Sequence, residues 1–115
     1  MLICNTYDSA QLSAGQGVPA YAYNFDISAA VFLGACHGSE LPYVFGTGTQ
    51  LTAGSQQAAA SALMERYWTR FASKGTPSGG SDPAWPSFST SNNQRMQFTL
   101  QGPSVVPNFH AARCV

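Results

Sequence analysis

Apolar residues recur every three or four positions between Ser55 and Ser73, and this periodicity constrains the fold more than any other feature of the chain. The residues concerned are Ala60, Leu63, Met64, Tyr67, Trp68 and Phe71. Such spacing places them on one face of an amphipathic helix. Ser55 is suited to cap the start of this helix, while Gly75 and Pro77 mark its end. Because a helix of this kind must bury its apolar face, we expect the face to belong to a core rather than to a ligand site.

Two other segments show the period of two that is typical of strands. Val18 to Phe25 alternates aromatic residues with small or polar ones, and Pro19 lies at its start, where a missing N–H is tolerated. Met96, Phe98 and Leu100 alternate with polar residues in the same way. These patterns predict one strand before the helix and a short, half-buried strand after it.

The remaining segments are expected to be less regular. The pattern over Asn5–Gln11 predicts a short helix end followed by a turn. Residues 75–93 are dense in glycine, proline, serine and asparagine, which predicts a surface loop, with Trp85 and Phe88 pinning it down. After Gly102-Pro103, the tail is expected to be irregular up to Cys114.

The composition excludes several classes of protein. Of the 115 residues, 44% are hydrophobic and only 9% are charged, whereas an ordinary soluble domain carries about 25% charged residues. The surface is therefore either rich in uncharged polar residues or meant to be buried against something absent, and we favour the second. The formal net charge is zero, and the one basic cluster, Arg66, Arg70 and Lys74, is too small for nucleic-acid binding. No apolar run approaches the roughly 20 residues that span a bilayer.

His37 stands between Gly34 and Gly38, in a segment that continues through Pro42 to Gly46. Glycine allows a positive φ and close approach by other parts of the chain, so these residues can form a loop that presents the imidazole. Pro42 bars a regular central strand or helix interior at its position. From the residues alone, His37 is either a packed, hydrogen-bonded histidine or a catalytic one.

This segment resembles the histidine loop of the type B carboxylesterases, the family that includes the cholinesterases, because the pattern GxxHGxELPYVFG is matched from Gly34 to Gly46. The resemblance continues in the same order through the helical residues 62–78, the element Trp85-Pro86-Ser87-Phe88 and a cysteine near each end. It covers nearly the whole chain. We therefore expect an α/β fold that is the C-terminal portion of an α/β-hydrolase, an incomplete domain over residues 1–115.

The resemblance implies a function for the histidine loop. In a serine hydrolase, an imidazole takes the proton of the attacking serine and returns it to the leaving alkoxide, and an ordinary histidine pKa of about 6.5 suits both steps. His37 is thus expected to be the general base and acid of a carboxylic ester hydrolase acting on a small ester, without cofactor or metal. Gly34, Gly38 and Glu40 are expected to support the loop.

Three cysteines are present, Cys4, Cys36 and Cys114, and they leave one over if a disulfide forms. Their spacing does not match a zinc site. The resemblance implies a bridge between Cys4 and Cys114, which would favour an oxidising compartment and hence a secreted or periplasmic protein. Adjacent residues rarely face each other, so we do not expect Cys36 to act with His37 as a catalytic pair.

The other parts of a serine esterase are missing from these 115 residues. There is no GxSxG elbow, since the nearest approach, Ser81, is followed by Pro83 where the second glycine should stand. No HGGG-type oxyanion motif is present, and Asp8 and Asp26 are poorly placed to be the acid. We therefore expect the nucleophile and the acid to lie in a missing N-terminal part of the fold that this chain needs, and the chain alone to be inactive.

Two alternatives to an ester hydrolase stay open, a non-catalytic module and an inactive fragment. The family contains non-catalytic binding or adhesion modules that have lost the serine, although the intact loop around His37 argues against that reading. An inactive gene fragment is the other, because the strand at Val18–Phe25 would expose unpaired edges without the rest of its sheet. His110 lies outside any motif of the family and is expected to have no catalytic role.

Overall fold

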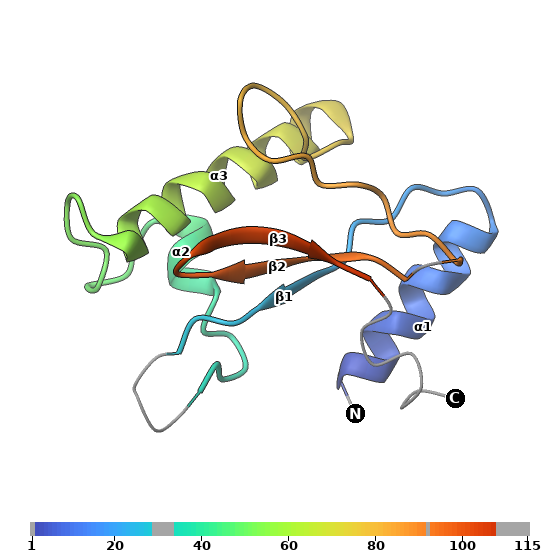
Figure 1. Cartoon of the computed structure of the whole chain (residues 1–115), viewed down its shortest axis with the longest axis horizontal. Coiled ribbons are helices and arrows are strands. Elements are labelled where there is room, and N and C mark those ends of the chain that lie inside the picture. Colours follow the sequence, from blue (N-terminus) through green and yellow to red (C-terminus); the bar gives the residue numbers. More distant parts are fainter. Residues whose placement is uncertain (1, 29–33, 92, 108–115) are drawn as a thin grey trace. The chain divides into compact units, whose positions relative to one another are not determined.

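The computed structural model describes residues 2–28, 34–91 and 93–107, with side chains from residue 5 onward. Its elements are α1 (Leu2–Gly15), β1 (Tyr23–Phe25), α2 (Leu41–Phe45), α3 (Gln56–Lys74), β2 (Arg95–Thr99) and β3 (Gly102–Val106) (Figure 1). The strands form one sheet in the order β1–β2–β3. Helices and a sheet within these residues confirm the expected α/β class. The helix at the start of the chain is longer than the short helix end that the sequence predicted.

The sheet is mixed. The Met96 amide donates to the Ala22 carbonyl at 2.9 Å, and the Asp26 amide donates to the Phe98 carbonyl at 2.8 Å. These two hydrogen bonds have the pattern of a parallel strand pair. In Figure 1 the arrows of β1 and β2 point the same way, whereas the arrow of β3 points in the opposite direction. The chain thus ends its described part in a β2–β3 hairpin.

The strand β3 corrects the expectation of an irregular tail after Gly102-Pro103, because it continues to Val106. Leu100 and Gln101 form the turn between β2 and β3, and the Thr99 hydroxyl donates to the Gly102 carbonyl at 3.1 Å. Gly102 has a φ of +118°, which only glycine adopts readily. Pro103 does not prevent the strand, because β3 lies at the edge of the sheet, where a residue without an N–H is tolerated.

The described residues fall into two compact units, and each of the three strands contributes to both. One unit comprises the described residues within 2–24, 85–97 and 104–107 and contains α1. The other comprises the described residues within 25–28, 34–84 and 98–103 and contains α2 and α3. Each unit has its own packing and is described separately.

In the unit with α1, Trp85 is the anchor. Its indole N–H donates to the Ala22 carbonyl at 3.2 Å, and the rings of Tyr21 and Tyr23 meet it edge to face at 6.3 and 6.1 Å. Phe88 is also buried, which confirms that these aromatic residues pin the loop. The predicted strand at Val18–Phe25 is shorter than expected, because only its last three residues join the ladder.

In the unit with α3, the predicted helix is confirmed together with both of its ends. The Ser55 hydroxyl accepts a bond from the Ala58 amide at 3.0 Å, and Gly75 closes the helix with a φ of +75°. Met64 and Tyr67 are fully buried. Tyr67 packs on Phe98 of β2 at 6.0 Å between ring centres. The middle of the predicted apolar face is therefore buried in the core of this unit.

One member of the predicted apolar face behaves differently. Phe71 is 50% exposed. Two apolar residues of α2 are at least as exposed, Leu41 at 51% and Phe45 at 70%. In the described part of the chain, the C-terminal end of the apolar face of α3 is therefore partly exposed to solvent.

Candidate functional site

His37 occupies the corner of a tight turn. The Ser39 amide donates to the Cys36 carbonyl at 3.1 Å, which makes His37 and Gly38 the two central residues of a four-residue turn. Gly38 has a φ of +79°, the value that a type II turn requires at its third position and that favours glycine there. The side chain of His37 is exposed. The turn thus presents the imidazole outward.

Gly34 and Cys36 form the approach to this turn. Gly34 has a φ of +63° and nothing within 4 Å of the place where a side chain would begin, so its conformation, not crowding, accounts for the glycine. The Cys36 thiol lies 4.0 Å from the Gly34 carbonyl and is exposed. The two glycines at which the sequence predicted special backbone conformations therefore both have them.

The turn leads directly into α2. The Leu41 amide donates to the Gly38 carbonyl at 3.2 Å, and the Glu40 carbonyl accepts from the amides of Tyr43 and Val44 at 2.9 and 3.0 Å. Glu40 is thus the N-cap residue, although its side chain makes no capping bond. Pro42 lies in the first turn, where no intrahelical N–H is needed. Sequence reasoning missed this helix because it weighed Pro42 as a breaker and not as a helix start.

Two groups near the turn are buried, the Ser39 hydroxyl oxygen and the Tyr43 ring. The Ser39 hydroxyl oxygen has no hydrogen-bond partner within the described part of the chain. Tyr43 of α2 is buried against Phe25, with 5.0 Å between ring centres, and burial raises the pKa of its phenol above the ordinary value. Only one side of α2 is therefore fixed in the core, since Leu41 and Phe45 are exposed.

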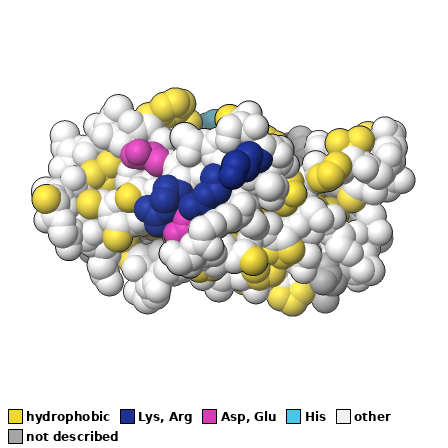
Figure 2. All heavy atoms as spheres, turned by 90° about the horizontal axis from the view of Figure 1, so that it is seen from above, with side chains coloured by type: hydrophobic (Ala, Val, Ile, Leu, Met, Phe, Trp, Pro, Cys, Tyr) yellow, Lys and Arg dark blue, Asp and Glu magenta, His cyan; other side chains and the backbone are white. Residues whose placement is uncertain are grey.

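The basic cluster on α3 serves a structural purpose. Arg66 donates two bonds of 2.9 Å to Asp82, and Arg70 forms an ion pair with the same carboxylate. Figure 2 shows the basic side chains as a row across one face with an acidic side chain against them. The two guanidinium groups lower the pKa of Asp82 to about 2. Two of the three positive charges of this cluster are therefore paired within the chain.

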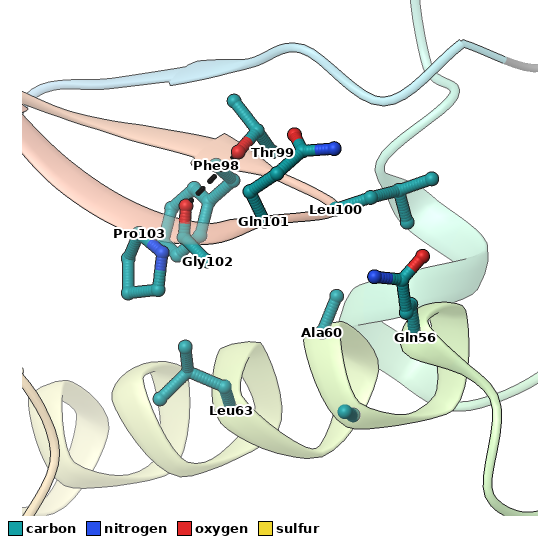
Figure 3. A pocket seen from close by; sticks show the side chains of 10 residues that line it. Gln56, Ala60, Leu63, Phe98, Thr99, Leu100, Gln101, Gly102 and Pro103 are labelled. Carbon is teal, nitrogen blue, oxygen red and sulfur yellow. Dashed lines mark hydrogen bonds between the residues drawn. The ribbon is translucent and has the colours of Figure 1, made fainter.

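A pocket of about 240 Å³ lies between α3 and the β2–β3 hairpin. Figure 3 shows Ala60 and Leu63 on the helix side and Gln101 and Pro103 on the hairpin side. None of its ten lining residues carries an imidazole, a thiol or a carboxylate. The pocket can receive an apolar group, but it offers no acid or base, and it contains no residue of the histidine loop.

Several predicted residues lie outside what the structure describes. Cys114, His110 and the side chain of Cys4 belong to them, so the bridge between Cys4 and Cys114 stays a prediction. Among the described residues, no group of three or more histidine, cysteine or acidic side chains could hold a metal ion. None of the described helices is both long and apolar enough to cross a membrane.

Sequence reasoning also missed Ser61, Glu65 and Gly46, which join α3 to α2. The Ser61 hydroxyl donates to the Tyr43 carbonyl at 2.7 Å, and the Glu65 carboxylate lies against Gly46. A signal was present for one of them, since Ser61 stands three residues before Met64 and so belongs to the apolar face. A hydroxyl on such a face needs a buried partner.

Comparison with known proteins gives one consistent result. The sequence model of the carboxylesterase family matches residues 1–115. The chain is similar to an acetylcholinesterase of Bungarus fasciatus, at 33% identity over 98% of this chain and 20% of that protein, and to a carboxylesterase 4A of Bos taurus, at 31% over 75% and 17%. A carboxylesterase crystal structure from Geobacillus stearothermophilus matches 90% of this chain and 22% of its own, with a TM-score of 0.74 and 29% identity. The chain thus spans about a fifth of the length of these relatives.

Proposed function

This chain belongs to the carboxylesterase family, and we propose that it supplies the catalytic histidine, His37, of a hydrolase that cleaves small carboxylic esters. The observation that carries the proposal is the position of His37 at the corner of a turn, exposed, with a positive-φ glycine three residues before it and another directly after it. The function therefore rests on how this side chain is presented.

The imidazole of His37 acts in both halves of the reaction. In the first half it takes the proton of a serine hydroxyl as the serine oxygen bonds to the ester carbonyl carbon, and it then gives that proton to the departing alkoxide. In the second half it takes a proton from water, whose oxygen attacks the acyl-enzyme, and returns the proton to the serine. The products are a carboxylic acid, an alcohol and the original enzyme.

The neighbouring residues support this role from the backbone. Gly38 allows the positive φ angle within the turn, and Gly34 allows the positive φ angle in the approach to it. Glu40 begins α2 through its carbonyl, which fixes the direction in which the chain leaves His37. We assign Glu40 a supporting role and not that of the triad acid.

The serine and the acid of the triad come from elsewhere in the complete hydrolase, because these 115 residues contain no GxSxG sequence. The chain by itself is then expected not to hydrolyse esters. We also propose the bridge between Cys4 and Cys114 that the family resemblance implies, which would suit a secreted or periplasmic protein.

The proposal is tested with a grafted enzyme, in which this chain replaces the matching segment of the carboxylesterase of Geobacillus stearothermophilus. Hydrolysis of p-nitrophenyl acetate is measured for the grafted enzyme and for its His37→Gln variant. The same substitution at His110, the other histidine of the chain, is the control. We expect His37→Gln to lower kcat by about a thousandfold or more and His110→Gln to leave it nearly unchanged.

A different outcome would favour another function. If the grafted enzyme folds, as judged by a cooperative melt, and is inactive with His37 intact, the chain is better explained as a non-catalytic binding module. Activity that survives His37→Gln would show that the proton is carried by another group.

A further inference from the structure

Ser61 is a polar side chain in the buried middle of α3. It is only 3% exposed, and its hydroxyl donates to the Tyr43 carbonyl at 2.7 Å. Burying a hydroxyl is costly unless it is hydrogen-bonded, and this bond joins residues that are 18 positions apart. The carbonyl of Tyr43 belongs to the last turn of α2, where carbonyls lack a partner within the helix. The bond therefore satisfies a polar group on each helix.

Glu65, one turn further along α3, makes the second connection. Its carboxylate lies 3.3 Å from the Ser61 hydroxyl. It also lies so close to Gly46, at the end of α2, that a Cβ atom there would be 2.5 Å from the Glu65 Oε1 atom. Gly46 has a φ of +64° and closes α2 with its N–H on the Pro42 carbonyl. The end of α2 is thus fitted closely onto α3.

The connection reaches His37 through backbone turns. The bond from the Leu41 amide to the Gly38 carbonyl overlaps the turn that carries His37 at its corner. Every residue from Cys36 to Phe45 therefore belongs to a turn or to α2. A shift of α2 along α3 would move the imidazole with it.

We propose that Ser61, with Glu65 and Gly46, is a positioning residue for His37, acting through α2. This inference rests on the proposed function of His37 as the base. Ser61 does not touch the reacting atoms; it fixes the place of the helix that holds the turn. A misplacement of about 1 Å at a reacting group can cost roughly a hundredfold in rate, so a small loosening of α2 has a measurable effect.

The test substitutes Ser61 in the grafted enzyme. We expect Ser61→Ala to lower kcat by roughly tenfold to a hundredfold with KM within about twofold, since the base and not the ester pocket is displaced. Ser61→Thr, which keeps the hydroxyl, should restore most of the rate. The matched control is Ser73→Ala on the same helix, whose exposed hydroxyl bonds to the Arg70 carbonyl of its own helix; it should leave kcat unchanged.

A double substitution separates positioning from mere structural support. In the His37→Gln background, Ser61→Ala should cause no further loss of the residual rate, because it acts only through His37. An equal loss in both backgrounds would overturn the inference. If His37→Gln itself has no effect, the proposed function fails and not the connection between the helices.

Amide hydrogen exchange on the grafted enzyme provides a readout that needs no activity. Ser61→Ala should speed exchange in a peptide covering residues 38–47 while exchange in the second half of α3 stays slow. If Ser61→Ala does not fold, Ser61→Cys keeps the volume with a weaker donor and should show the same local effect to a smaller degree. Unchanged exchange over residues 38–47 would contradict the proposal.

Discussion

The histidine loop and the loop that follows α3 are built in opposite ways. Around His37, from Cys36 to Leu41, the histidine loop is held by backbone turns and leaves its imidazole exposed. The loop over residues 75–84 is held by side chains. Arg70 donates to the Pro77 carbonyl at 3.2 Å, and the Tyr67 hydroxyl donates to the Pro83 carbonyl at 2.5 Å.

In the loop after α3, polar side chains are used to hold the fold, whereas in the histidine loop the imidazole is left available for chemistry. Asp82 is fully occupied by two guanidinium groups, so its charge contributes to folding and is not available for chemistry. A catalytic imidazole must instead remain free to exchange protons with substrate and nucleophile. Holding the histidine loop through backbone bonds leaves its side chain available. The predictions below test whether the two loops differ in this way.

The largest expected effect on stability comes from removing the Tyr67 side chain, which bonds to the loop over residues 75–84. Tyr67→Ala removes a fully buried ring that packs on Phe98 and bonds to the Pro83 carbonyl. We expect it to lower the free energy of unfolding by about 3–5 kcal/mol, measured by urea denaturation. Phe71→Ala, at a half-exposed ring on the same helix, is the control and should cost much less.

Asp82→Asn tests the ion pairs of the same loop. It should lower the free energy of unfolding by about 1–2 kcal/mol, since charged hydrogen bonds are lost but the exposed side of Arg66 is screened by water. Asp8→Asn, at an exposed position of α1, should have almost no effect. Equal losses for the two variants would show that the ion pairs do not hold the loop.

The same carboxylate predicts a dependence on pH. The pKa of Asp82 falls from 3.8 to about 2 in the folded chain, so the unfolded state binds its proton more readily. The ion pairs therefore stabilise the fold fully above about pH 4, and this contribution is lost as the pH falls toward about pH 2. Denaturation of the natural chain and of Asp82→Asn should give curves that converge as the pH is lowered through this window; parallel curves would contradict the assignment.

Gly38→Ala tests the backbone of the histidine loop. At a φ of +79°, a Cβ atom costs about 1 kcal/mol, and the free energy of unfolding should fall by about that amount. Gly15→Ala introduces a methyl group with nothing within 4 Å and without a positive φ, so it serves as the control. A loss no larger than that of Gly15→Ala would mean that the turn has another geometry.

The smallest expected effect is at His37 itself. Because its side chain is exposed, His37→Gln should change the free energy of unfolding by less than about 0.5 kcal/mol. A large loss in urea denaturation would mean that the imidazole is part of the packing, and the contrast between the two loops would disappear.

Local sequence patterns predicted the elements that depend on local signals. The helix α3, its cap at Ser55 and its end at Gly75 followed from periodicity and from known capping residues. Trp85 and Phe88 were expected to pin the loop over residues 75–93, and both are buried. The strand β3 and the helix α2 could not be read from the residues, because Pro103 and Pro42 discourage regular structure unless the edge of a sheet or the start of a helix accommodates them.

The candidate site divides in the same way. The glycines around His37 indicated an unusual loop, and the positive φ angles of Gly34 and Gly38 explain them. The connection from Ser61 to Tyr43 could not be predicted, since it joins two helices whose packing depends on the tertiary fold. A serine within an apolar stripe signals that some partner exists, but not which carbonyl it is.

The most direct test of the central claim is the time course of p-nitrophenolate release by the grafted enzyme, followed from mixing. If His37 is both base and acid, His37→Gln should slow the initial burst, which reports acylation, and also the later steady rate, which reports turnover. Each phase should lose about a thousandfold or more. A burst of unchanged rate in His37→Gln would contradict the account, because the serine would then be activated without this imidazole.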